Sequence, residues 1–309
     1  MKAHMRNIGV IAQKGFADHL YSPGFRMLLG IFTLVIVSMS VISGKNGHNI
    51  FEFGFLDVAQ VITLFLPVLG LALGFDSVIR EKNSKSLNTL LTHPVFRDNL
   101  VSGKIIGGIG TLVLVVFISV IASIGTLLLI TGIDVGLSEL NRIIVFSLLT
   151  FLYLSGFFAF SLLISIVSKS SESSFISGLV VWINLVLIFG AIVTAASSII
   201  TGESIVNLGH NEEAMSMSED LQKLSPASYY AEAVTGVRVS YGSFGISSGK
   251  ETRGIFDTRV GIGTWFADYW TNMVILTAIP VLMFIFSYLV FLRRDIGGEK
   301  GGIMILKKL

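Results

Sequence analysis

The chain has 309 residues, of which 52% are hydrophobic and only 14% are charged, and its mean hydropathy is +0.79. This composition excludes an ordinary soluble protein, whose surface needs more charge, and predicts a polytopic membrane protein. The net charge of +2 is too small to indicate nucleic-acid binding, and the absence of cysteine excludes disulfides and thiolate metal sites.

Residues 1–25 are predicted to form an amphipathic helix in the headgroup plane, in contact with membrane lipids. An apolar stripe at helical spacing lies opposite charged residues; its members are Met5, Ile8, Ala12, Phe16 and Leu20. Pro23 then turns the chain into the first span. The segment is either a simple anchor for that span or a direct contact for a partner protein, and both interpretations stay open.

Six uncharged runs follow, each near or above the roughly 20 residues that a helix needs to cross hydrocarbon. They cover residues 27–44, 58–75, 105–133, 143–168, 173–202 and 269–292. The fold class predicted from these runs is an all-α polytopic membrane protein with six transmembrane helices. Spans one to five occupy residues 26–200, and the sixth occupies residues 269–293.

The basic residues predict the orientation of the bundle. Fifteen of the 22 Lys and Arg residues lie in residues 1–26, in the loop from 80 to 104, at position 169 or in residues 293–309. Because cytoplasmic loops carry the excess of basic residues, both termini are predicted to be cytoplasmic. Residues 201–268 then form one sizeable extracytoplasmic loop, and Trp265, Tyr269 and Trp270 are expected at the outer interface, as amphipathic rings prefer.

The loop between the second and third spans gathers the charge that the rest of the chain lacks. Asp76 and Arg80 are spaced to pair on a helix that leaves the membrane, and Glu81 follows at the water boundary. A short amphipathic helix is predicted from Ser84, with leucines at 87, 90 and 91, and it stops before Pro94. This helix either rests on lipid and on its own bundle or docks on a cytoplasmic partner.

The order of residues in GFDSVIREKNSKSLNTLLTHPVFRDNLVSGKIIGG resembles the signature of ABC transporter permeases of the ABC-2 class. Further likeness comes from IAQKGFADHLYSPGF near the N-terminus, from LSPASYYAEAVTGV before the last span and from FLRRDI after it. The chain departs from the family at Lys14-Gly15, where a Lys-Glu pair is usual, and at Lys85-Ser86, where Gly-Thr is common.

The resemblance implies a permease subunit of an exporter in the prokaryotic plasma membrane. Two such chains, identical or similar, would bind two ATPase subunits, which carry ATP and magnesium (Mg). The segment 81–94 would be the coupling helix that fits a groove on the ATPase. The residues that this implies for ATPase coupling are Asp76, Arg80, Glu81, Lys85, Ser86, Leu87, Leu90, Leu91 and Pro94.

No energy-converting site is predicted in the chain itself. The fragments DNLVSGKI and FGISSGKE lack the first Gly of a phosphate loop and lack Ser or Thr after the Lys. The five histidines have no partners at a spacing typical of hydrolases. The chain is therefore predicted to be non-catalytic, with no cofactor of its own. The alternative is a membrane scaffold that recruits partners through its outer loop without transport.

Polar residues inside the spans are few. Trp182 and Asn184 near the middle of the fifth span serve either helix association or the substrate pathway. The spacings Gly70/Gly74 and Gly103/Gly107 would let helices approach closely. In the outer loop, His210, Met215 and Met217 could form a soft-metal site with nearby glutamates. A solvated acidic loop is favoured, because no ligand spacing repeats, and no metal site is predicted.

Overall fold

The computed structural model describes residues 2–45, 55–83, 97–132, 135–202, 204, 211–236 and 254–293, and all regular structure in these ranges is helical. The elements are α1 (Lys2–Tyr21), α2 (Pro23–Lys45), α3 (Phe55–Gly74), α4 (Ile79–Asn83), α6 (Arg97–Thr131), α7 (Leu137–Val167), α8 (Ser171–Trp182), the π-helix η2 (Ile183–Ile188), α9 (Phe189–Thr201), α10 (Glu212–Gln222), α11 (Pro226–Thr235) and α12 (Ile262–Arg293).

Six of the described segments are long and apolar enough to cross a membrane. They are α2, α3 with α4, α6, α7, the continuous run α8–η2–α9, and α12. The prediction of an all-α membrane protein with six spans is confirmed. The segment predicted as the coupling helix falls largely outside the described residues, because Lys85, Ser86, Leu87, Leu90, Leu91 and Pro94 lie between α4 and α6; His210 and the tail 294–309 lie outside them too.

Three of the spans begin well before the uncharged runs predict, at residues 97, 137 and 262 instead of 105, 143 and 269. The helices α6, α7 and α12 include the charged residues Lys104, Arg142 and Asp268, each of which was taken as the boundary of a run. Lys104 and Arg142 are only 8% and 4% exposed, because other parts of the chain satisfy their charges. A buried and partnered charge does not end a helix, so charge alone marks the limits of these spans poorly.

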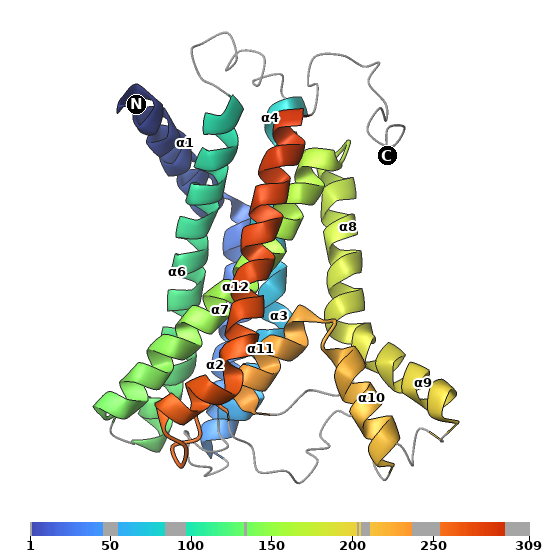
Figure 1. The fold of residues 1–309 in the computed structure, drawn as a ribbon. Helices are drawn as coiled ribbons and strands as arrows, with labels where there is room; N and C mark the ends of the chain where they lie inside the picture. Colours follow the sequence, from blue (N-terminus) through green and yellow to red (C-terminus); the bar gives the residue numbers. More distant parts are fainter. Residues whose placement is uncertain are drawn as a thin grey trace.

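The centre of the bundle is the contact between α3 and α7, which lie side by side in Figure 1. Gly70 and Gly74 face α7 so closely that an added Cβ would come within 2.8 Å of the Leu154 carbonyl oxygen and within 2.6 Å of the Ser161 Cβ, respectively. Only glycine permits this approach of two backbones. The predicted close approach is confirmed, and its partner is another span of the same chain.

The N-terminal helix α1 lies along α6 at the end of the bundle that also holds α4, here called the α4 end (Figure 1). Ala12 and Phe16 of its predicted apolar stripe pack on α6 rather than on lipid alone. At Gly107 an added Cβ would lie 2.6 Å from the Ala12 carbonyl oxygen, and at Gly103 it would lie 2.6 Å from the Ile11 Cγ2. The helix is thus fastened to the third span as well as joined to the first.

The short helix α11 lies at the opposite end of the bundle, here called the α11 end, and belongs to the hydrophobic core (Figure 1). Ala227, Tyr230 and Ala233 have no exposed surface. Trp265 is also fully buried, and its indole N–H donates to the Ala233 carbonyl at 3.0 Å. The prediction that Trp265 is an interfacial ring is therefore wrong, because α11 covers it. Trp270 is 61% exposed.

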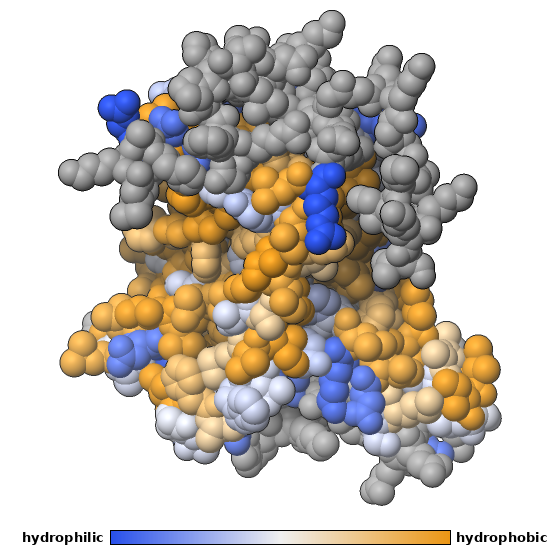
Figure 2. Space-filling view, turned by 45° about the horizontal axis from the view of Figure 1, so that its top comes forward, coloured by the Kyte–Doolittle hydropathy of each residue, from blue (hydrophilic) through white to orange (hydrophobic). Residues whose placement is uncertain are grey.

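The outer surface of the bundle is apolar between its two ends. Figure 2 shows hydrophobic side chains over most of the described surface that it presents. On α6 the exposed residues Ile106, Val113, Phe117 and Ile121 follow helical spacing. In a protein that spans a membrane such a face contacts lipid tails, so these side chains need no partner protein.

Candidate functional site

The candidate site lies at the α4 end, where the chain leaves α3 and runs toward the predicted coupling helix. Residues 75–78 form a turn between α3 and α4. The backbone N–H groups of Val78 and Ile79 both donate to the Ser165 hydroxyl on α7, each at 3.2 Å. Since the first amides of a helix have no partner within it, Ser165 acts as a cap supplied by a distant span.

Asp76 in this turn accepts a hydrogen bond from the Ser171 hydroxyl, at 2.5 Å. Ser171 is the first residue of α8, so this contact joins the turn to the fifth span. The predicted pairing of Asp76 with Arg80 is wrong. Both residues are described, no ion pair joins them, and Arg80 is exposed. The turn separates α3 from α4, and Asp76 faces α8 while Arg80 faces outward.

Glu81 on α4 forms an ion pair with Lys104 on α6, with 2.8 Å between a carboxylate oxygen and the ammonium nitrogen. The two side chains are 10% and 9% exposed, respectively. The sequence predicts Glu81 at the water boundary, and this prediction is wrong, because the residue lies inside the protein. A carboxylate tolerates this burial only when an opposite charge neutralises it, and Lys104 provides that charge.

The helix α1 covers the other side of Lys104. An added Cβ at Gly15 would lie 3.9 Å from the Lys104 Cδ, in ordinary van der Waals contact. Burial, and then the charge of Lys104, lower the pKa of His19 to about 4, although Asp18 opposes this. His19 is therefore neutral at physiological pH. The result is one polar cluster, made of Asp76, Glu81, Lys104, Ser165 and Ser171, that connects α4 with three spans.

Residues 10–296 match the sequence pattern of the family described as ABC-2 family transporter protein. The chain belongs to this family. It is similar to two proteins named probable ABC transporter permease protein NosY. The one from Stutzerimonas stutzeri is 27% identical over 199 residues, which cover 62% of this chain and 71% of the relative. The one from Pseudomonas aeruginosa is 26% identical over 104 residues, which cover 32% and 38%.

Membership of the ABC-2 family, together with six apolar helices, makes the chain the multi-pass membrane subunit of an ABC transporter in the cell membrane. In this setting the polar cluster lies where α3 leads into the segment 84–96. The cluster is a firm joint between α4 and the spans, because its ion pair is buried and its turn is capped from another helix.

Trp182 and Asn184 lie apart from the cluster, farther along the fifth span of this ABC-2 protein. The indole N–H of Trp182 donates to the Leu64 carbonyl on α3, at 3.0 Å, so this ring fastens two spans. Asn184 lies in the π-helix η2 and is exposed, and its amide N–H donates to the Val180 carbonyl at 2.8 Å. Helix association explains Trp182, whereas Asn184 faces away from its own bundle.

Four residues of the site were not among the predicted coupling residues: Lys104, Ser165, Ser171 and His19. Each is contacted by a segment far along the chain, and Ser165 is more than 80 positions from the amides that it caps. Serine is common in membrane helices and is usually bonded to the carbonyl one turn earlier, as Ser147 is. No local pattern distinguishes a serine that caps another helix.

Proposed function

We propose that this chain is the permease subunit of an ABC exporter and that two copies of it are driven by two separate ATPase subunits, which bind ATP and magnesium. The buried polar cluster at the root of the predicted coupling helix carries the proposal. Family membership supports ATPase partners in general. The pairing of two chains, the coupling segment 81–94 and the export direction are the finer parts that we propose.

The cluster supports a route by which movement of the coupling segment reaches the spans. The helix α4 is joined to α6 by the Glu81 and Lys104 ion pair and to α7 by the Ser165 cap. The preceding turn is joined to α8 by the contact between Asp76 and Ser171. Because these groups are buried or partly buried, water cannot replace their contacts when α4 moves. A displacement of α4 therefore moves the three spans together.

The exposed amide of Asn184 supports a second copy of the chain as the neighbour of the fifth span. Among the described residues its Oδ1 has no hydrogen-bond partner, and the residue lies midway along the run α8–η2–α9. A primary amide that faces lipid tails is unfavourable. Two such amides related by a two-fold axis can donate to and accept from each other, so identical chains satisfy both. In this proposal the substrate pathway runs along the contact between the fifth spans of the two chains.

The coupling segment is tested by replacing Leu90 and Leu91 with Asp. These two leucines lie outside the described residues. If these leucines insert into the ATPase, the double variant buries two unpaired charges, and the ATPase that copurifies with the wild-type chain is lost. The control replaces the same leucines with Met, which keeps the apolar contact. Retention of the ATPase at wild-type stoichiometry by the Asp variant, with normal membrane insertion, would show that the segment is not the dock.

Transport coupling is tested separately from docking. The complex is reconstituted in lipid, and ATP hydrolysis is measured for the ATPase alone, for the wild-type complex and for Glu81→Ala. We expect the chain to change the hydrolysis rate and Glu81→Ala to abolish that change while the complex stays assembled, since Glu81 transmits movement without touching the ATPase. Identical rates in all three samples would favour the passive scaffold over the transporter.

A further inference from the structure

At the α11 end, residues 254–261 and the start of α12 form one unit with α11. The Ile255 backbone N–H donates to the Val234 carbonyl at 3.2 Å, and the Trp265 indole N–H donates to the Ala233 carbonyl at 3.0 Å. Gly254 passes so close to the Val234 carbonyl that a Cβ there would overlap it. We call α11, residues 254–261 and Trp265 the α11 unit.

The α11 unit is attached to one stripe of α7. The stripe consists of Arg142, Phe146, Thr150 and Tyr153, spaced four, four and three residues apart, which places them on one helix face. Phe146 meets Phe256 with ring centroids 5.2 Å apart. Thr150 shares a 2.8 Å hydrogen bond with the Tyr230 hydroxyl, and Tyr153 stacks on the Tyr230 ring at 4.5 Å. All of these contacts, like the Arg142 contact below, join α7 to the α11 unit.

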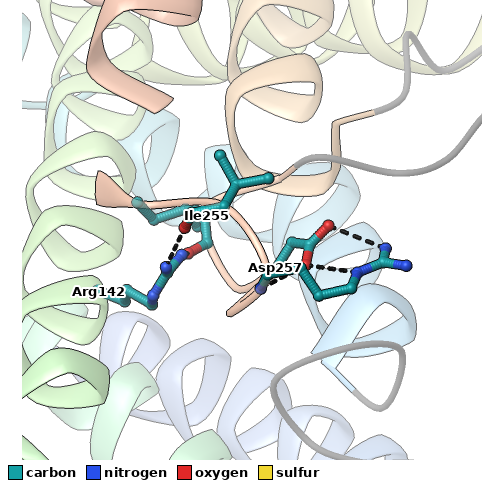
Figure 3. A network of polar contacts seen from close by, with 5 residues as sticks. Arg142, Ile255 and Asp257 are labelled. Atoms are coloured by element: carbon teal, nitrogen blue, oxygen red, sulfur yellow. Dashed lines mark hydrogen bonds and ion pairs between the residues drawn. The ribbon is translucent and has the colours of Figure 1, made fainter. Parts of the chain in front are cut away.

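Arg142 makes the contact nearest the end of the stripe. Its guanidinium donates to the Ile255 carbonyl at 2.6 Å and to the Val260 carbonyl at 2.5 Å, as Figure 3 shows for Ile255. The residue is 4% exposed, and its Nε has no hydrogen-bond partner among the residues that the structure describes. No described carboxylate lies within 4.0 Å of it. Asp257 of the same turn is held instead by Arg259, at 2.9 Å (Figure 3).

This arrangement makes the buried charge of Arg142 depend on the position of the turn. The two carbonyls are its only acceptors in the described structure, and both move if residues 254–261 move. Charge-assisted hydrogen bonds are about twice as strong as neutral ones, and a buried guanidinium without acceptors is strongly unfavourable. Arg142 therefore resists any displacement of the turn that does not also bring water to it.

We propose that Arg142 is a latch that holds the α11 unit closed against α7 at the α11 end of the bundle. Release of the latch uncovers the face of α7 on which α11 packs and admits water to the guanidinium. The significance of that release for transport rests on the proposed function. The link is α7, which is one continuous helix from Leu137 to Val167 and carries Ser165, the cap of α4, near its other end. The latch and the coupling site are thus joined by a single helix.

The latch is tested with a single cysteine at Thr150, which has no exposed surface where α7 meets Tyr230 of α11. The chain has no other cysteine, so a maleimide reports this position alone. In lipid nanodiscs, without nucleotide, Thr150→Cys is expected to react slowly. With Arg142→Gln added, we expect labelling about tenfold faster or more, because the closed state loses both charge-assisted bonds. The control Arg259→Gln removes an arginine from the same turn and is expected to leave labelling slow.

Arg142→Lys keeps the charge but can reach only one of the two carbonyls, so its labelling rate should lie between those of the wild type and Arg142→Gln. It is the decisive variant if the Gln variant does not yield folded protein. Labelling as slow as in the wild type for either folded Arg142 variant, or equally fast labelling in the Arg259 control, would overturn the latch. None of these measurements uses the ATPase, so failure of the proposed function is recognised separately, by unchanged ATP hydrolysis.

Discussion

The ion pair between Glu81 and Lys104 allows the sharpest test of the candidate site. We consider three variants, Glu81→Gln, Lys104→Met and the double variant that carries both changes. Each single variant leaves one charged group in a position where the side chains are only 10% and 9% exposed. The double variant leaves none. Comparison of the four proteins isolates the interaction between the two residues from the effect of each change alone.

The magnitude follows from the geometry. At 2.8 Å and an effective dielectric constant of about 20, the attraction between the two charges is about 6 kcal/mol. Loss of hydration offsets much of this attraction, so the pair adds little net stability over an apolar pair. Removal of one partner from a buried pair nevertheless costs about 3–5 kcal/mol, because the remaining charge stays buried without the opposite charge of that partner. The double variant should therefore be more stable than either single variant.

The assay is equilibrium unfolding in mixed micelles, followed by tryptophan fluorescence, with ATP hydrolysis of the reconstituted complex as the functional measurement. Lys223 supplies a matched control, because it pairs with Asp220 at 2.5 Å while their side chains are 43% and 72% exposed. Lys223→Met should lower stability by less than about 1 kcal/mol. If Lys104→Met lowers the stability no more than Lys223→Met, or if the two single effects simply add, the reasoning about a buried pair is refuted.

Three further predictions concern packing, protonation and topology. Gly74→Ala should destabilise the chain by about 1–3 kcal/mol in the same unfolding assay, since its Cβ would press on α7, whereas Gly30→Ala, with no atom within 4 Å, should not. Stability should fall as the pH is lowered from 6.5 to about 4, because the pKa of His19 is lowered in the folded chain, so the unfolded chain binds a proton in this range and the folded chain does not. Melting curves of His19→Gln should lack this part of the pH dependence. A cysteine at the exposed Ser216 of α10 should react with an impermeant reagent on intact cells, and labelling only after lysis would reverse the predicted orientation.

The number and order of the spans could be predicted from the sequence because the requirement is local. A helix that crosses hydrocarbon needs about 20 residues without uncompensated charge, and this property is visible in any window of the chain. The close approach permitted by Gly70 and Gly74 was predictable for the same reason, since small residues four positions apart share one helix face. What these windows do not contain is the identity of the partner helix.

The partners of the charged and aromatic residues were decided by the tertiary structure alone. Lys104 and Arg142 were read as limits of spans, because a charge in isolation is excluded from hydrocarbon, yet α4 neutralises one and two carbonyls of the turn 254–261 satisfy the other. Trp265 was read as an interfacial ring, because a short helix such as α11 cannot be recognised as part of the core from ten residues. Burial depends on the rotation and tilt of helices that are distant in sequence, and no local pattern specifies these.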